Sequence, residues 1–415
     1  MEQLSSGSGP HVLRWLNAAA VLTALRGVGS ARVADLVAST SLTRPTVTQA
    51  LAALERAGWA EMGPGEPPRK MAVRRIGRPA QQVRFRSEAG HVLGIDIGRH
   101  KLLAAVADLS GTVLAQCRRD VGASYQGQDL VTEVESVVDA ALAQTGLSRA
   151  SITSVAVGTP GIVSDGRILL SPSIAGWAGI PLAQELSQSF ACPVLVDNDV
   201  NLAVLAERWR GVQEPVNTLV FVHWGARLGA GLMIGGRLHR GATAAAGEIG
   251  FVDVADIPTP RPGAQGLGPL EADVGTGAIA RLAQEAVRRQ KSPLRSLLAA
   301  SPDPLDVSAV FRCATDGDAV ALAIVDEIAA RFARGVAPLF LLLDPDLVVI
   351  GGGVSLGGRV LLDAVDRHLR GRTLVPPPLV LSSLGDTSVA LGAVRLALDD
   401  VEERLFSPAA LSSVA

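Results

Sequence analysis

Four polar residues at the start of one short helical segment have side chains that suit contacts with nucleic acid. They are Arg44, Thr46, Thr48 and Gln49. An arginine and short polar side chains at the positive end of a helix suit phosphate oxygens and base edges. The alternative for this segment by itself is an ordinary surface helix of a globular domain.

The residues between and around this polar set predict the element that would position it. An apolar stripe with the i, i+3, i+4, i+7 spacing of a helix is formed by Val47, Ala50, Leu51 and Leu54. Thr43 is a good N-cap, and Pro45 lies in the first turn, where its missing N–H is not needed. Residues 39–58 are therefore predicted to be the turn and the second helix of a helix-turn-helix, which enters a DNA major groove.

A basic stretch follows this helix. Residues 69–86 contain seven basic residues and no acidic one, and short apolar pieces at 71–73 and 83–85 alternate with the charges as strands of a small wing would. A charge run is usually only a solvated face, but after a helix-turn-helix a surface for phosphate is the better interpretation. Arg78, between Gly77 and Pro79, could enter a narrow minor groove and is the predicted wing contact.

Charge is unevenly divided along the 415 residues. Residues 1–90 carry 12 Lys and Arg against 6 Asp and Glu, a net of +6, whereas the remainder carries 26 against 34, a net of −8. This asymmetry predicts a basic head that binds double-stranded operator DNA. The chain has no apolar run of the roughly 18–20 residues that a membrane helix needs. It also lacks a signal sequence, so we expect a cytoplasmic protein that does not use a membrane.

Beyond residue 90 the pattern changes to apolar strands that end in glycine turns. The first strand ends in Asp96-Ile97-Gly98, and strand, Asp-x-Gly turn, strand is how actin-like ATPase folds present their first phosphate loop. A later strand ends in the polar cluster 197–199 and opens a helix that runs to about Trp209. Further strands are predicted at 101–108, 111–118, 155–163, 218–223, 229–234 and 346–350.

This ordered series resembles the ROK family, which groups sugar kinases with sugar-responsive repressors that carry an N-terminal winged helix. The resemblance covers nearly the whole chain. It implies a winged helix-turn-helix domain, mainly α with a small β wing, at residues 1–88. It further implies an α/β two-lobed, actin-like ATPase fold of the ROK sugar-kinase type at 89–400, and a C-terminal tail at 401–415. A homodimer or homotetramer is implied as well.

Four residues match the family's sugar-binding positions. By that resemblance Asp199 has the place of the kinases' general base, with Asn198 beside it on the sugar, and Glu248 and Glu271 match acceptors of sugar hydroxyls. Carboxylates suit this role because their paired oxygens accept hydrogen bonds from vicinal hydroxyls. In the alternative interpretation, Asp199 is a helix N-cap without a ligand and the two glutamates order loops.

The phosphate loops depart from those of the family's kinases. Arg99 and His100 stand where the kinases' Asp-x-Gly-Gly-Thr loop has Gly and Thr, and Arg227 replaces a glycine of their Gly-Thr-Gly loop. Arg227 could itself bind a phosphate, but a transfer loop of this shape is disabled. We therefore predict no kinase activity, no catalytic residue and no cofactor. The alternatives are a sugar kinase with an accessory DNA-binding domain, and a regulator whose pocket binds no ligand.

The zinc site common in the family is absent from the sequence. Phe251 stands where relatives have a histidine, and residues 260–270 lack their cysteine cluster, so these positions offer no tetrahedral zinc ligands. That histidine also contacts sugar in relatives, and Ser173 replaces another sugar-contacting residue, an asparagine. We expect a transcriptional regulator, a repressor, whose body senses a sugar or sugar derivative between its lobes and shifts the population of head arrangements.

Overall fold

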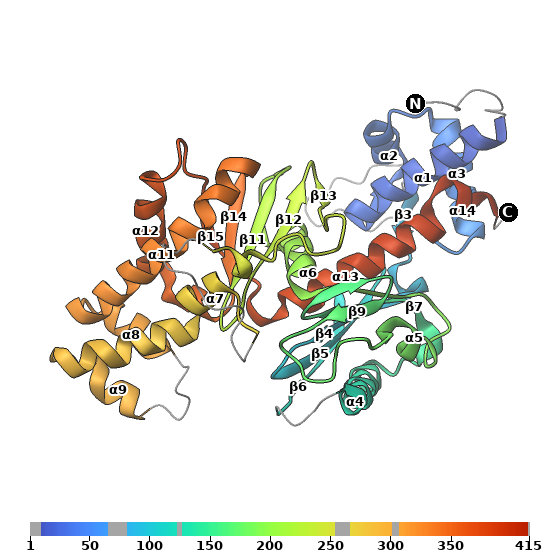
Figure 1. Ribbon diagram of the computed structural model, residues 1–415. Coiled ribbons are helices and arrows are strands. Elements are labelled where there is room, and N and C mark those ends of the chain that lie inside the picture. Colours follow the sequence, from blue (N-terminus) through green and yellow to red (C-terminus); the bar gives the residue numbers. More distant parts are fainter. Residues whose placement is uncertain (1–9, 65–80, 123–126, 254–265, 301–306, 414–415) are drawn as a thin grey trace, which may run out of the picture.

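The computed structural model describes residues 10–64, 81–122, 127–253, 266–300 and 307–413, which form a head and a two-lobed body (Figure 1). Within these residues no helix is both long and apolar enough to cross a membrane.

The head is a winged helix-turn-helix. Its elements are α1 (Pro10–Val28), β1 (Ser30–Arg32), α2 (Val33–Thr40), α3 (Arg44–Arg56), β2 (Ala60–Pro64) and β3 (Gln81–Phe85). Ser41 ends α2 in a left-handed conformation, with φ 58°, which turns the chain toward α3. The three strands form an antiparallel sheet in the order β1-β3-β2. The predicted strand at 83–85 lies within β3, and 71–73 lies outside the described residues.

The smaller lobe is built on a five-stranded sheet. Its main elements are β4 (His91–Ile97), β5 (Lys101–Asp108), β6 (Val113–Asp120), α4 (Gly127–Thr145), β7 (Ile152–Thr159) and β10 (Val194–Asn198). The strand order is β10-β7-β4-β5-β6. Two short strands, β8 (Ile162–Ser164) and β9 (Arg167–Leu170), and the short helix α5 (Leu182–Ser187) complete this lobe. Every residue of β4 is buried, because this central strand is covered on both faces.

The larger lobe has a second five-stranded sheet, with the order β13-β12-β11-β14-β15. The strands are β11 (Leu219–Trp224), β12 (Leu228–Ile234), β13 (Arg237–Leu238), β14 (Leu347–Gly351) and β15 (Leu379–Leu381). The helices are α7 (Pro269–Val274), α8 (Thr276–Arg289), α9 (Leu294–Ala300), α10 (Ser308–Thr315), α11 (Ala319–Leu343) and α12 (Gly358–Arg370). Trp224 stacks on Phe332 with 3.9 Å between ring centroids, which joins the sheet to α11.

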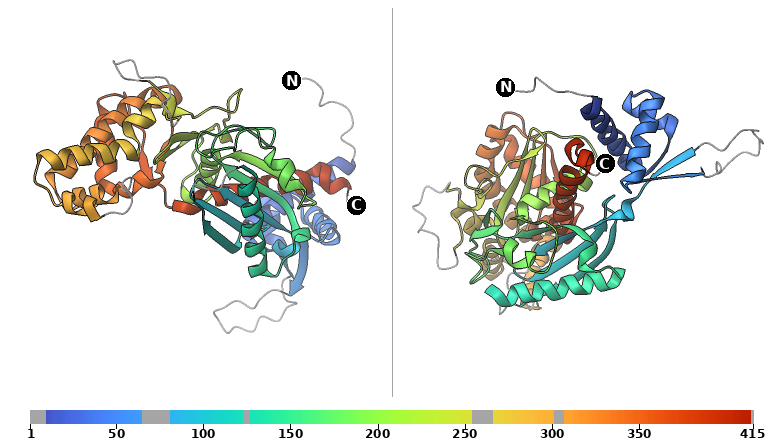
Figure 2. Two further views of the ribbon diagram at one scale, coloured as in Figure 1. Left: turned by 60° about the horizontal axis from the view of Figure 1, so that its bottom comes forward. Right: turned by 90° about the vertical axis from the view of Figure 1, so that its right-hand side faces the viewer.

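Two helices connect the lobes and the head. Helix α6 (Asp199–Ala206) packs against α13 (Ser388–Val401), and α13 also covers β4 and β7. The two helices lie so close that a Cβ on Gly392 would fall 1.8 Å from the Leu202 carbonyl oxygen. From α13 the chain continues through a π-helical turn (Glu402–Phe406) into α14 (Pro408–Ser413), which packs on α1 of the head (Figure 2).

The head and the smaller lobe share one hydrophobic core. This core joins apolar side chains of α1, α3 and β3 to those of β4, β5, α13 and α14. Most of the segment expected to be a C-terminal tail, residues 401–415, is thus helical and packed against the head. The domain boundaries at 88 and 400 stay predictions.

Candidate DNA interface and ligand site

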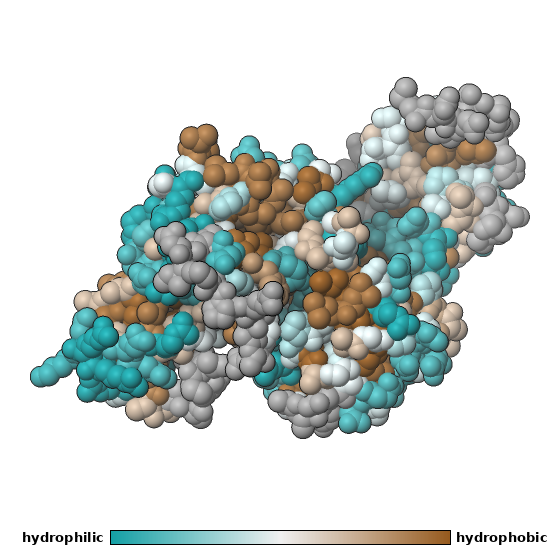
Figure 3. Space-filling model, in the orientation of Figure 1, coloured by the Kyte–Doolittle hydropathy of each residue, from teal (hydrophilic) through white to brown (hydrophobic). Residues whose placement is uncertain are grey.

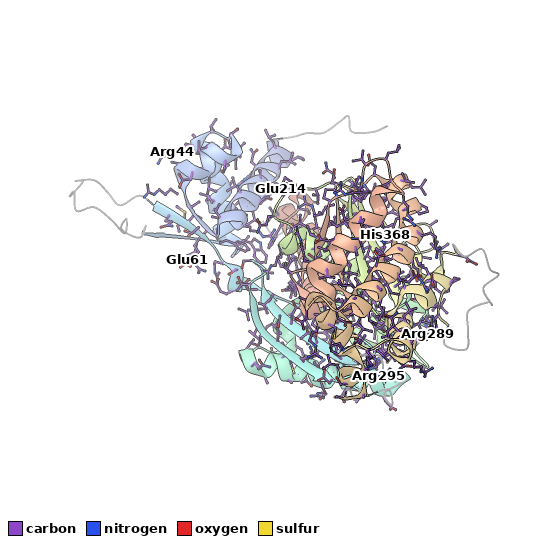
Figure 4. All side chains as sticks on the ribbon, turned by 90° about the vertical axis from the view of Figure 1, so that its left-hand side faces the viewer. Arg44, Glu61, Glu214, Arg289, Arg295 and His368 are labelled. Carbon is purple, nitrogen blue, oxygen red and sulfur yellow. The ribbon has the colours of Figure 1, made fainter. Side chains whose placement is uncertain are left out.

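Helix α3 presents the predicted DNA-binding residues on its outer side. Val47, Ala50, Leu51 and Leu54 are buried as expected, whereas Arg44, Thr48 and Gln49 are exposed. Figure 4 shows Arg44 on the head, on the side away from the larger lobe. Thr46 is half-buried and its hydroxyl lies 2.8 Å from that of Thr43. Arg44 and Gln49 therefore have their side chains available for an external partner.

In the described part of the wing, acidic residues hold the arginines of β3 and of the residue that follows it. Arg84 of β3 donates to Glu61 at 2.7 Å and to Glu88 at 2.8 Å, so these two carboxylates neutralise it. The hydrogen bond from Arg84 lowers the pKa of Glu88 to about 2. Arg86 is 3.5 Å from Glu88. The predicted wing contact, Arg78, lies outside the described residues.

Two of the predicted sugar-binding carboxylates come from different lobes. Asp199 begins α6, and Glu248 lies in the loop after β13; both are half-buried. Burial raises the pKa of Asp199 to about 6. Burial also raises the pKa of Glu248, and the negative charges of Asp199 and Glu271 add to that rise. These two carboxylates therefore lie within electrostatic reach of each other across the interlobe region.

The other two predicted residues are engaged by the backbone. Asn198, rather than Asp199, is the N-cap of α6: its side chain accepts from the amides of Val200 at 2.8 Å and Asn201 at 3.2 Å. Glu271 is buried, and its two oxygens accept from the amides of Leu228 at 2.9 Å and Gly268 at 2.8 Å. Both side chains hold the loops that frame the interlobe region.

An ion pair that the sequence analysis missed joins the two lobes. Arg240, in the loop after β13, contacts Asp197 at the end of β10 at 2.6 Å, and Asn201 donates to the second oxygen of Asp197 at 2.9 Å. The side chain of Asp197 is buried. The loop that carries Glu248 is thus tied directly to the strand that leads into Asp199.

The first phosphate loop holds an internal cation. Asp96 is buried at the end of β4, and its carboxylate lies 3.1 Å from the ammonium of Lys101 on β5. Burial raises the pKa of Asp96 to about 6, although the Lys101 charge opposes this rise. Lys101 also donates to the carbonyl of Asp386, next to the start of α13. The carboxylate of the Asp-x-Gly turn is therefore paired within the protein.

A cavity of about 600 Å³ lies between the lobes. It is lined by residues of the first phosphate loop, the segment 171–178, the turn at Ala226 and Arg227, and the start of α8. Ser173 is among them, whereas Asn198, Asp199, Glu248 and Glu271 are not part of the lining. Arg227 connects the two regions, because it lines the cavity and lies 3.5 Å from Glu271.

The residues that replace the family's zinc ligands do not fit a metal. Phe251 offers no donor atom and is 44% exposed. Among the described residues there is no group of three or more His, Cys, Asp or Glu side chains that could hold a metal ion. Residues 254–265 of the corresponding loop lie outside the described part of the chain.

A winged helix-turn-helix on a two-lobed body with an interlobe cavity defines a regulator with a sugar-kinase-like body. The family model named ROK family matches residues 92–400, and the IclR helix-turn-helix domain model matches residues 16–63. The chain belongs to the ROK family.

Individual relatives include both kinases and regulators. The chain is 29% identical to a glucokinase of Halalkalibacterium halodurans, over 68% of this chain and 86% of that protein. It is 24% identical to the xylose repressor of Caldicellulosiruptor bescii, over 78% of this chain and 82% of that protein. Its fold is similar to a crystal structure of a ROK family transcriptional regulator, a homologue of the E. coli MLC protein. That likeness has a TM-score of 0.76 at 23% identity and covers 97% of this chain and 99% of the other. With its helix-turn-helix head, the protein is a DNA-binding transcriptional regulator.

Proposed function

We propose that this regulator is a repressor whose body binds a sugar or sugar derivative without phosphorylating it, and that binding releases the head from operator DNA. The observation that carries the proposal is the continuous packing from the interlobe helices α6 and α13 to the head. A ligand shifts the equilibrium between two conformations only as far as its affinities for them differ. The sugar must therefore bind more tightly to a lobe arrangement in which the head binds DNA weakly.

The proposed sugar acceptors are Asp199 and Glu248. The Asp199 side chain accepts a hydrogen bond from the amide of Val200 at 2.9 Å with one of its two oxygens. The Glu248 side chain forms no hydrogen bond within the described residues, which leaves its oxygens available for hydroxyl groups. Asn198 and Glu271 are assigned the role of positioning these acceptors, because the backbone amides described above occupy their oxygens.

The absence of phosphoryl transfer is part of the proposal. Lys101 holds its ammonium against Asp96, and Arg99 and Arg227 line the cavity beside the two phosphate loops. A transfer site needs an available carboxylate for the metal and close backbone approach to the phosphates. The alternative is a sugar kinase with an accessory head, favoured by the glucokinase relative. This alternative is tested by measuring ATP turnover with a broad panel of sugars. It stands only if a sugar supports turnover and the Asp199→Asn substitution abolishes that turnover.

We further propose a homodimer or a homotetramer. Helix-turn-helix proteins usually read two half-sites of an operator with two copies of the head. The larger lobe exposes apolar side chains at Leu374 and Val375, which a second copy could cover. Figure 3 shows that hydrophobic patches occur on both lobes, with hydrophilic residues between them.

The experiment that tests the proposed function is operator release by a sugar. The operator is selected from random DNA with the full chain, and binding is followed by fluorescence anisotropy while D-glucose, D-xylose and other sugars are added. We expect one sugar to weaken operator binding by at least about tenfold, the effect of 1.4 kcal/mol of differential binding. Glu248→Gln should reduce this release and leave the affinity for operator unchanged. If every sugar fails, or if Glu248→Gln responds as the parent does, the sensor assignment is wrong.

A further inference from the structure

The carboxylate of Asp197 lies at the end of β10, where the smaller lobe meets the larger one, and each of its oxygens has two donors. One oxygen accepts from the backbone amide of Asn198 at 2.8 Å and from the side chain of Asn201 at 2.9 Å. The other oxygen accepts from Nε of Arg240 at 2.8 Å and lies 2.6 Å from Nη2 of the same guanidinium. The side chain of Asp197 is 7% exposed, whereas that of Arg240 is 44% exposed. The Arg240 pair is thus the contact of this carboxylate that crosses to the larger lobe.

The loop that begins at Arg240 is held at both of its ends and leads to Glu248. The carbonyl of Arg240 accepts from the amide of Ala246 at 3.2 Å. The carbonyl of Gly247 accepts from the amide of Ala230 on β12 at 2.8 Å. Gly247 has φ +91°, and a Cβ there would fall 1.8 Å from the carbonyl oxygen of Ala230. One end of the loop is therefore tied to β10 of the smaller lobe and the other end to β12 of the larger lobe.

The two proposed sugar acceptors belong to the same two chain segments as this ion pair. Asp199 follows Asp197 at the start of α6, and Glu248 comes directly after the loop that Arg240 begins. Burial raises the pKa of Glu248, and the negative charge of Asp199 adds to that rise. Because like charges repel each other, the two acceptors by themselves push the lobes apart. The ion pair between the same segments opposes that repulsion.

Another arginine reaches from the larger lobe to the smaller one with a weaker contact. Arg227 donates to the carbonyl of Pro172 at 3.4 Å, which is a long hydrogen bond to a neutral acceptor. Hydrogen bonds between two ionised groups are shorter and roughly twice as strong as those between neutral groups. The contact of Arg240 with Asp197 is therefore the stronger of these two links between the lobes.

We propose that Arg240 is a positioning residue whose ion pair with Asp197 holds the two lobes at a fixed spacing. At that spacing Asp199 and Glu248 can bind one sugar together. This inference rests on the proposed function and adds the residue that sets the lobe arrangement for the effector. Without the ion pair the lobes sample wider spacings, so part of the binding free energy of the sugar is used to order them.

The first test is sugar binding to Arg240→Met, which removes the guanidinium and keeps a long unbranched side chain. Isothermal titration calorimetry on the full chain is carried out with D-glucose, D-xylose and the other sugars of the operator-release panel. We expect Arg240→Met to bind the sugar about tenfold or more weakly than the parent chain. Arg240→Lys, which keeps the charge with fewer donors, should recover part of the affinity. The matched control is Arg237→Met, the same change on an exposed arginine of β13, which should bind as the parent does.

A double-mutant cycle separates positioning from a general effect on stability. If Arg240 acts by placing Glu248, adding Arg240→Met to Glu248→Gln should weaken sugar binding by a smaller factor than Arg240→Met does in the parent. Fully additive losses would overturn the proposal. A lower urea midpoint of Arg240→Met with unchanged sugar affinity would overturn it as well, because an ion pair that only stabilises the fold gives that result.

The second measurement needs no ligand and follows the spacing of the lobes by double electron–electron resonance. Spin labels are attached at Ala143→Cys of α4 and Glu285→Cys of α8, two exposed positions in different lobes (Figure 1), after the native cysteines are replaced by alanine. We expect Arg240→Met to shift or broaden the distance distribution and Arg237→Met to leave it unchanged. An unchanged distribution in Arg240→Met shows the inference to be wrong. If no sugar of the panel binds the parent chain, the proposed function fails, and this measurement by itself decides whether Arg240 sets the lobe arrangement.

Discussion

Asp199, a proposed sugar acceptor, is a half-buried carboxylate whose ionisation state would affect sugar binding. Burial raises its pKa to about 6, and one oxygen accepts from the amide of Val200. The ionised form can accept hydrogen bonds from sugar hydroxyls, whereas a proton on Asp199 removes part of that capacity. The pKa of Glu248 is shifted in the same direction. Both groups therefore become protonated at a pH where ordinary carboxylates are still charged.

This property predicts pH-dependent sugar binding. Affinity for the inducing sugar should be constant well above pH 6 and should fall as the pH drops through the pKa of Asp199. Below that pKa, the association constant for the sugar should fall by up to about tenfold per pH unit if one proton competes with the ligand. Calorimetric titrations between about pH 5 and pH 8 measure it. Asp199→Asn should bind more weakly and with a flatter profile; a flat profile in the unmodified chain would contradict the assigned acceptor.

Helix α13 is the element that joins the proposed ligand-binding region to the head. It packs on α6, β4 and β7 and continues into the π-helical turn that ends at Phe406. Phe406 lies edge-on to Trp59 at 5.0 Å and to Phe85 at 6.2 Å between ring centroids. Arg26 of α1 also bonds Glu402 at 2.9 Å. A movement of α13 would therefore reach helix α1, Trp59 and strand β3 of the head.

The contact at Phe406 gives a prediction for this element. Phe406→Ala should lower the free energy of unfolding by about 3 kcal/mol, since a buried aromatic ring is removed from a packed core. It should also reduce the effect of the inducing sugar on operator binding. Urea unfolding and anisotropy measure the two effects. The control is Phe251→Ala, because Phe251 is 44% exposed and should change stability little; equal losses in both variants would argue against the coupling role of the Phe406 contact.

Local elements could be predicted from the sequence, whereas contacts between distant elements could not. The stripe of Val47, Ala50, Leu51 and Leu54 has helical spacing and is buried in α3, and the strand at 101–108 is β5. The ion pair of Arg240 with Asp197 depends on how the two lobes meet, which no local pattern records. The pairing of Lys101 with Asp96 likewise requires the geometry of the hairpin that joins β4 and β5.

At the scale of the whole molecule, two heads on one operator would bind more tightly than one. If the protein is a dimer or tetramer, it should bind an operator with one half-site destroyed about 100-fold or more weakly than the intact operator. On the intact operator, the second head binds within a complex that the first head has already formed. Analytical ultracentrifugation gives the oligomeric state, and anisotropy gives both affinities. A monomer that binds both operators equally would contradict the proposed assembly.

The shared core of the head and α14 has a consequence for the order in which the protein is made. Arg26 and Glu402, which pair across this core, are 376 residues apart in the chain. A ribosome therefore makes Phe406, an apolar partner of the head, only after it has made both lobes of the body. A chain that stops before Phe406 carries α3 without the aromatic ring that packs on Trp59 and Phe85. The head of such a product would be incompletely packed, so it should not compete with the finished protein for the operator.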